Sequence, residues 1–154
     1  MVILLGVLFL VALVYEASQG AEAPWTIAGV ASNAGFTGAD LVTAVAIAYA
    51  ESSGNPNATN LVPPDNSYGL WQINLNAHPE YDPVSILDPQ TNADAAFAIY
   101  SAAGNSFKPW GTYLPPYGNG SYQQYTNQAQ TDVGNMSASG FDDSGDDSGD
   151  DEES

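Results

Sequence analysis

The sequence predicts a mainly α-helical (α+β) domain with a short β element, placed between an apolar N-terminal helix and a disordered acidic C-terminal tail. Two runs with helical spacing, at residues 37–54 and 88–104, and an aromatic run between them support this prediction. The chain has 154 residues, enough for one domain with additional segments. We expect an N-terminal segment at 1–23, a domain at 24–120 and a polar, acidic tail at 121–154.

Residues 2–15 are apolar without interruption. As a helix they would span roughly 21 Å at about 1.5 Å per residue, less than a hydrocarbon core of about 30 Å. This length suits a secretory signal, and Ala21-Glu22-Ala23 offers a small-residue cleavage pattern, but no Lys or Arg precedes the run. A cleaved signal, a retained membrane anchor and an ordinary core helix all stay open. The first two place the domain outside the cytoplasm.

The first helix of the domain is expected after Thr37, where residues 37–40 resemble a capping box, and Gly54 would be its left-handed cap. Its apolar face is formed by Leu41, Ala44, Val45, Ala48 and Ser52.

Residues 68–74 (YGLWQIN) suit a short strand or hairpin arm. Asp88 and Pro89 are typical of an N-cap and first helical position, which predicts a helix over 89–103 that ends at Gly104. Residues 107–117 predict an ordered, aromatic loop. Polar residues dominate beyond about residue 120, and residues 141–154 hold eight acids and no base, which predicts a solvated tail.

The charge balance excludes several classes of function. Eighteen acids against Lys108 alone give a net charge of -17, which argues against a nucleic-acid partner and against docking on an anionic membrane. The absence of cysteine excludes disulfides and thiolate zinc sites, and with His78 as the single histidine, expected in a loop, we predict no metal or cofactor. Scarce lysine with abundant aspartate suggests a halophile or its virus as the source, a hypothesis that salt-dependent activity would test.

Glu51 is the strongest candidate for chemistry. It ends the apolar helix, about 80° from the centre of the apolar face, so its side chain would be partly desolvated. The negative end of the helix dipole also disfavours its charge. Both effects raise a carboxyl pKa, as a general acid near neutral pH requires. On this segment alone, a surface glutamate that ends a helix is the simpler alternative.

The downstream motifs add a family resemblance. E-S-x-x-N-x-x-A-T-N at residues 51–60, followed by Y-G-L-W-Q-I-N at 68–74, resembles the catalytic core of the lysozyme superfamily, including the SLT-type lytic transglycosylases of bacteria and phages. Residues 87–96 resemble the segment after the active-site sheet in such domains. Phe107, Trp110 and Tyr113 resemble the aromatic end of phage versions. The resemblance covers about residues 25–115.

The resemblance implies a small lysozyme-like domain that cleaves peptidoglycan, or a related polysaccharide, at the β-1,4 bond after N-acetylmuramic acid. Glu51 would protonate the leaving oxygen. Gln72 and Asn74 would line the cleft on one strand, and Gly69 would let the substrate approach the backbone. The other residues matched to positions at or near the cleft are Ser52, Tyr68, Asn92 and Tyr100. Trp71 would either flank a sugar or be buried.

One position departs from the chicken-type lysozymes, which carry an Asp immediately before Tyr-Gly. Here this position is Ser67. Retaining and inverting glycosidases both need a second carboxylate. Asp65, two residues earlier, is one alternative. The simpler inference is a single-acid lytic transglycosylase, in which the N-acetyl group of the sugar assists and a 1,6-anhydro product forms. A hydrolytic lysozyme and a non-catalytic structural or glycan-binding protein stay open, as do a virion-associated and a secreted cellular setting.

Overall fold

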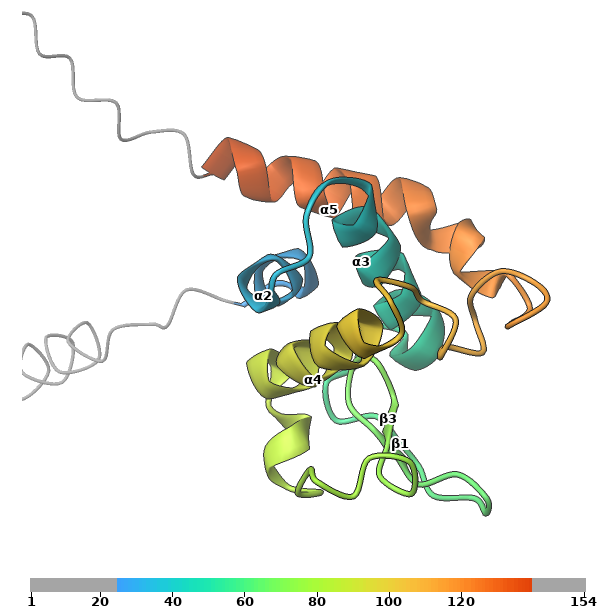
Figure 1. Ribbon diagram of the computed structural model, residues 1–154. Helices are drawn as coiled ribbons and strands as arrows, with labels where there is room; N and C mark the ends of the chain where they lie inside the picture. The colour runs from blue at the N-terminus through green and yellow to red at the C-terminus, as the bar shows by residue number, and fades with distance from the viewer. Residues whose placement is uncertain (1–24, 140–154) are drawn as a thin grey trace, which may run out of the picture.

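The computed structural model describes residues 25–139, which form a mainly helical domain with a small sheet (Figure 1). Its four α-helices are α2 (Ile27–Ala34), α3 (Gly38–Ser52), α4 (Pro89–Ala102) and α5 (Thr126–Ser139). The sheet is antiparallel, in the order β1 (Thr59–Asn60), β2 (Ser67–Tyr68), β3 (Ile73–Asn74). Two short 3₁₀ helices, η1 (Ser85–Leu87) and η2 (Ser121–Tyr125), complete it. The mainly helical prediction with a short β element is confirmed for this part of the chain.

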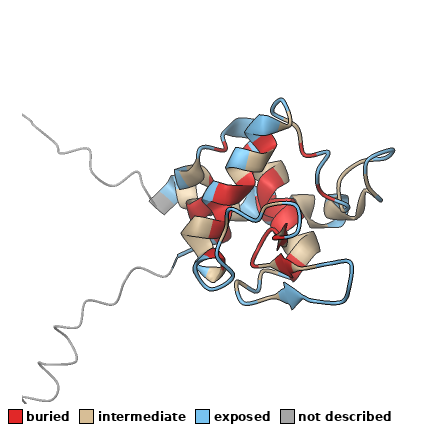
Figure 2. Cartoon of the chain, turned by 60° about the horizontal axis from the view of Figure 1, so that its bottom comes forward, coloured by how far each residue is buried: buried red, intermediate tan, exposed pale blue. Residues whose placement is uncertain are grey.

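Helix α3 is the centre of the core. All five residues predicted for its apolar face are buried, and so are Ala46 and Ile47, because α2, α5 and η2 pack around it. Figure 2 shows the buried residues gathered on the helices at the centre of the domain. Thr37 takes the N-cap position, but its side chain makes no capping hydrogen bond. The left-handed C-cap is Ser53, at φ 54°, and not Gly54 as the sequence predicted.

The segment 68–74 is a hairpin rather than one strand. Strands β2 and β3 pair with Ser67 opposite Asn74, and residues 69–72 form the turn between them. The expectation that Gln72 and Asn74 share a strand is therefore wrong, because Gln72 lies in the turn with a left-handed backbone (φ 47°). Trp71 is fully buried, and its indole N–H donates to the Ala44 carbonyl at 2.9 Å. It is therefore a core residue and does not flank a sugar.

Helix α4 begins as the sequence predicts. The Asp88 carboxylate accepts a 2.8 Å hydrogen bond from the Thr91 backbone N–H, and Pro89 takes the first helical position. This bond and a 2.9 Å bond from the Thr91 hydroxyl stabilise the charged carboxylate and lower the pKa of Asp88. Helix α4 packs against α2 and also contacts β3, so it connects the small sheet to the helical core.

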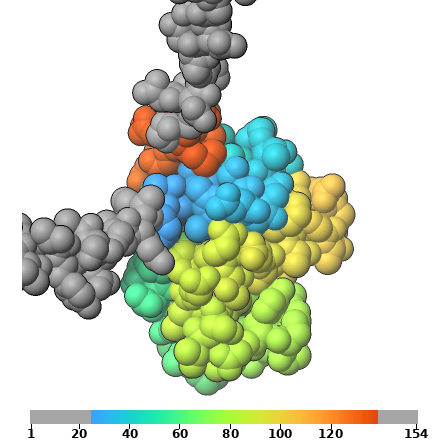
Figure 3. Space-filling view, turned by 90° about the vertical axis from the view of Figure 1, so that its left-hand side faces the viewer, coloured from blue at the N-terminus to red at the C-terminus, as the bar shows by residue number. Residues whose placement is uncertain are grey.

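The C-terminal boundary of the domain differs from the prediction of a disordered tail from residue 121. Residues 121–139 form η2 and α5, and both pack against α3. Ala129 is fully buried, and the Tyr49 hydroxyl donates a 2.6 Å hydrogen bond to Asp132. Figure 3 shows the surface of α2 lying between α5 and α4. Helix α5 therefore completes the core although its sequence is mostly polar.

The two terminal expectations lie outside the described residues. They are the signal or anchor at residues 1–23 and the acidic run at 141–154. Among residues 25–139, no helix combines the length and apolarity that crossing a bilayer requires.

Candidate active site

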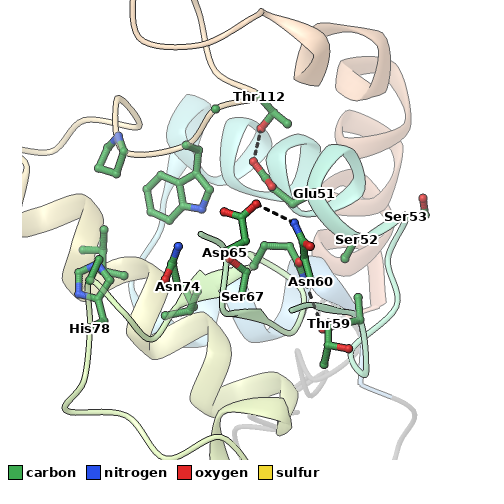
Figure 4. A pocket seen from close by; sticks show the side chains of 18 of the residues that line it. Glu51, Ser52, Ser53, Thr59, Asn60, Asp65, Ser67, Asn74, His78 and Thr112 are labelled. Atoms are coloured by element: carbon green, nitrogen blue, oxygen red, sulfur yellow. Dashed lines mark hydrogen bonds between the residues drawn. The ribbon is translucent and has the colours of Figure 1, made fainter. Parts of the chain in front are cut away.

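A cavity of about 910 Å³ opens between the end of α3, the small sheet and the loop after α4 (Figure 4). It brings together residues far apart in the sequence. Glu51 and Ser52 come from α3, and Gln72 and Asn74 come from the hairpin. The loop residues 109–112 also line the cavity. Four of the eight predicted site residues therefore line one cleft.

Glu51 lies half-buried at the cleft wall. Its Oε1 atom accepts a 2.8 Å hydrogen bond from the Thr112 hydroxyl. Burial raises the pKa of Glu51 above its ordinary value, while hydrogen bonds from the side chain and backbone of Thr112 partly offset that rise. The Glu51 carboxyl group therefore stays protonated up to a higher pH than the carboxyl group of a solvated glutamate. This property suits a proton donor.

The side chains of Gln72 and Ser52 at the cleft also have hydrogen-bond partners within the domain. The Gln72 side-chain amide donates to the carbonyls of Gly69 and Ala58, at 2.9 and 3.1 Å. These bonds stabilise the left-handed turn at Gln72, an unfavourable conformation of the kind that is often kept at functional sites. The Ser52 hydroxyl donates back to the Ala48 carbonyl, one turn earlier in α3, at 2.8 Å.

A second carboxylate lines the same cleft. Asp65, in the loop between β1 and β2, accepts a 3.0 Å hydrogen bond from the Asn60 side-chain amide. Figure 4 shows Asp65 and Asn60 at the cleft together with Glu51. Asp65 therefore reaches the cavity although Ser67 occupies the position expected for an acid.

Two predicted site residues, Gly69 and Asn92, serve the fold instead of the cleft. Asn92 is fully buried and accepts a 2.9 Å hydrogen bond from the Trp71 backbone N–H. Its amide donates to the carbonyls of Tyr68 and Ile86, at 3.0 and 2.9 Å. A Cβ atom at position 69 would lie 2.3 Å from the Asn92 amide nitrogen, so Gly69 gives room to Asn92 and not to a substrate.

Tyr68 and Tyr100 also lie outside the cleft lining. Tyr68 packs half-buried against the core. Tyr100 is buried in an aromatic cluster with Phe36 and Phe107, and its hydroxyl donates a 2.5 Å hydrogen bond to Asp40. That bond to a carboxylate, together with burial, raises the pKa of Tyr100 to about 12.

The sequence did not indicate Thr112 as a site residue, nor the location of His78 at the cleft. His78 is a loop residue as predicted, but it also lines the cleft, with Nδ1 3.3 Å from Glu80 Oε1. Thr112 is 61 positions from Glu51 and lies in a loop without regular secondary structure, so no local periodicity links the two residues. Within residues 25–139, no group of three or more His, Asp or Glu side chains is arranged to hold a metal ion.

A family model described as "Lysozyme like domain" matches residues 28–112, which is more than half of the chain. The chain belongs to the lysozyme-like domain family. This confirms the resemblance found in the sequence, and the family indicates a glycan-cleaving enzyme that acts on peptidoglycan. No curated protein gives a significant match. No solved structure does either. The matched region ends at Thr112 and contains the helix that carries Glu51. It therefore includes both residues of the hydrogen-bonded pair.

Proposed function

We propose that this lysozyme-like domain is a peptidoglycan lytic transglycosylase in which Glu51 is the catalytic acid. The observation that carries the proposal is the half-buried Glu51 carboxyl group at a cleft of about 910 Å³, with a pKa raised by burial. A polysaccharide needs an open groove rather than a closed pocket, and the acid must meet the bridging oxygen between two sugars.

The proposed reaction has two proton transfers. Protonated Glu51 gives its proton to the glycosidic oxygen, and the bond from C1 of N-acetylmuramic acid to that oxygen breaks. The N-acetyl carbonyl of the same sugar stabilises the positive charge at C1. The Glu51 carboxylate then removes the proton from the C6 hydroxyl, whose oxygen attacks C1. The products are a 1,6-anhydro end and a free 4-hydroxyl, and Glu51 regains its proton.

Hydrolysis is the second candidate, and Asp65 is the observation that favours it. A second carboxylate at the same cleft would support either direct attack on C1 or activation of a water molecule. Its hydrogen bond from the Asn60 side-chain amide would hold the carboxyl group in place at the cleft. An Asp65→Asn variant separates the two mechanisms, because a single-acid transglycosylase retains its activity while a two-carboxylate hydrolase loses it.

The test is the release of soluble fragments from purified peptidoglycan by the full chain. Glu51→Gln should abolish release, because glutamine cannot donate the proton. Glu80→Gln is the matched control, since it removes the same charge from an exposed glutamate outside the cleft lining. Loss of release in Glu51→Gln but not in Glu80→Gln supports the proposal. A chain that binds peptidoglycan at every salt concentration without releasing fragments is instead a non-catalytic glycan-binding protein.

Because peptidoglycan lies outside the cytoplasm, the proposed substrate implies that the domain acts there. A virion-associated role in penetrating a host wall is compatible with this proposal, as is a secreted cellular enzyme. Fractionation of the producing cells and of any virus particles, followed by detection of the chain, separates the two settings.

A further inference from the structure

Thr112 makes a direct contact with the proposed catalytic acid. Its hydroxyl donates a 2.8 Å hydrogen bond to Glu51 Oε1, and its backbone also bonds to the carboxyl group. Both residues line the cleft, and Figure 4 shows the Thr112 hydroxyl pointing at the carboxyl group. No reacting group of a substrate needs to touch Thr112 for this contact to matter.

Backbone hydrogen bonds hold the loop that carries Thr112 in place at that residue and on both sides of it. Backbone carbonyls of residues 111–113 accept hydrogen bonds from N–H groups further along the chain. The pairs are Asn119 to Gly111 at 2.9 Å, Tyr122 to Thr112 at 3.2 Å, and Gly120 to Tyr113 at 2.7 Å. Gly118 permits this close pairing, because a Cβ there would lie 2.5 Å from the carbonyl oxygens of Gly111 and Tyr113.

Residues 119–122, which brace the Thr112 loop, lead into an element that contacts the helix carrying Glu51. Tyr122 belongs to η2, which packs against α3, the helix that ends in Glu51 and Ser52. The distance between Thr112 and Glu51 is thus set by two elements that are packed together. The bracing residues 119–122 lie beyond the segment matched by the family model, which ends at Thr112.

Resting on the function proposed above, we infer that Thr112 is a positioning residue that holds the Glu51 carboxyl group at the cleft and stabilises the carboxylate formed when Glu51 gives up its proton. A hydroxyl donor binds a charged carboxylate more strongly than a neutral acid. Its contribution therefore grows as the proton leaves, which lowers the barrier rather than tightening substrate binding. The geometry is prepared before the substrate arrives, because the loop is already braced.

The test compares Thr112→Val, which keeps the shape and removes the hydroxyl, with Thr112→Ser, which keeps the hydroxyl. Thr91→Val is the matched control, since the Thr91 hydroxyl also bonds a carboxylate, that of Asp88 at 2.9 Å, outside the cleft lining. We expect Thr112→Val to lower kcat roughly 10- to 100-fold with little change in KM. Thr112→Ser should restore most of the rate, and Thr91→Val should leave it unchanged.

The pH dependence of kcat/KM distinguishes a positioning role from a merely structural one, because loss of a structural contact would not shift it. Without the hydroxyl, the charged form of Glu51 is less stable, so its pKa rises further. The alkaline limb of kcat/KM, where Glu51 loses its proton, should move to higher pH in Thr112→Val and return in Thr112→Ser. An NMR titration of the Glu51 carboxyl carbon should show the same upward pKa shift without any substrate.

The outcomes separate this inference from the proposed function. If Glu51→Gln is inactive while folded Thr112→Val keeps the wild-type kcat, alkaline limb and Glu51 titration, the role of Thr112 is overturned and the function stands. A change in KM alone overturns it as well, because that identifies a substrate contact. If Glu51→Gln remains active, the proposed function fails, and the NMR titration still tests the contact itself. Thr112→Ala replaces Thr112→Val if the valine variant does not fold.

Discussion

The amide of Asn92 occupies the space that a side chain at position 69 would need. A Cβ atom on Gly69 would lie 2.3 Å from Asn92 Nδ2 and 2.6 Å from its Cγ, and Gly69 has a left-handed backbone with φ 78°. The Asn92 side chain in turn bonds to the backbone at Tyr68, just before the hairpin turn, and at Trp71, within it. The turn that carries Gln72 into the cleft therefore depends on α4.

Replacing Gly69 by alanine should destabilise the fold. The new methyl group meets a buried side chain with no free space, and the left-handed backbone adds strain. We expect a loss of about 2–4 kcal/mol in the free energy of unfolding, measured by urea denaturation. Gly104→Ala is the control, because it has the same left-handed φ (79°) but nothing within 4 Å of the added Cβ. Equal losses in the two variants would show that the Asn92 contact has no effect.

Asn92→Asp tests the hydrogen bonds rather than the space. An aspartate keeps the shape and can still accept from the Trp71 N–H, but it cannot donate to the carbonyls of Tyr68 and Ile86. It would also place a carboxylate, fully buried, against two carbonyl oxygens. We expect a loss of about 3 kcal/mol or more near neutral pH, reduced in acid as the aspartate is protonated. A loss that does not depend on pH would contradict this account.

Helix α5 should be required for stability although its sequence is polar. A chain that ends at residue 120 loses the buried Ala129 and the Asp132 partner of Tyr49. We expect a decrease of about 2–4 kcal/mol, or a Tm lower by roughly 10–20 °C, in a thermal melt. A chain that ends at residue 139 should melt like the full chain. Identical melting of the two truncated chains would show that α5 does not contribute to the core.

Glu51→Gln should make the protein more stable as it becomes inactive. Burial raises the pKa of Glu51 in the folded state above its ordinary value of 4.5, so the folded state holds that proton more tightly than the unfolded state. Below about pH 4 both states are protonated and the residue contributes nothing to the pH dependence. As pH rises through the folded-state pKa, ionisation destabilises the fold.

Thermal melts of the wild type and Glu51→Gln at about pH 4 and about pH 8 measure this effect. The Tm advantage of the variant should be larger at the higher pH. The control Glu80→Gln removes an exposed carboxylate and should show no such growth. An advantage for Glu51→Gln that shrinks with rising pH would mean that the Glu51 carboxylate is stabilised by its surroundings, contrary to the burial found here.

The net charge of -17 predicts that cleavage of an anionic wall depends on salt. Like charges repel at low ionic strength, whereas about 1 M salt shortens the Debye length to about 3 Å and screens the repulsion. We expect fragment release from whole peptidoglycan to increase with NaCl concentration, mainly through KM. A short glycan fragment whose carboxyl groups have been amidated is the control substrate and should show little dependence. An optimum in dilute buffer would contradict the predicted salt requirement.

The sequence predicts the elements whose signals are local. Helices α3 and α4 have an apolar run or a cap that needs no distant partner, as Asp88 and Pro89 illustrate. Helix α2 also has local caps, Thr26 at its start and Gly35 at its end, but it is eight residues long and made largely of small residues, so it is too short for a helical repeat to stand out. Helix α5 buries a narrow stripe that includes Ala129, which polar neighbours hide in the sequence. Burial of these two helices depends on contacts with α3 that local spacing does not show.

The candidate site likewise contains residues that local sequence indicates and residues that only the fold reveals. Glu51 is predicted because its place after a long apolar helix implies both burial and a raised pKa, as found. Asn92 and Tyr100 match the family pattern, but a sequence match does not distinguish a residue that faces the cleft from one that supports it. Thr112 depends on a loop fold 61 positions away, so only the three-dimensional arrangement identifies it.

The masses of the new glycan ends show whether Glu51 acts alone, first as an acid and then as a base. Purified peptidoglycan is digested with the full chain, and the soluble fragments are analysed by mass spectrometry before and after borohydride reduction. We expect 1,6-anhydro ends, one water molecule lighter than hydrolysed ends and unchanged by borohydride, in the wild type and in Asp65→Asn but not in Glu51→Gln. Reducing ends that disappear in Asp65→Asn would contradict it and identify a two-carboxylate lysozyme.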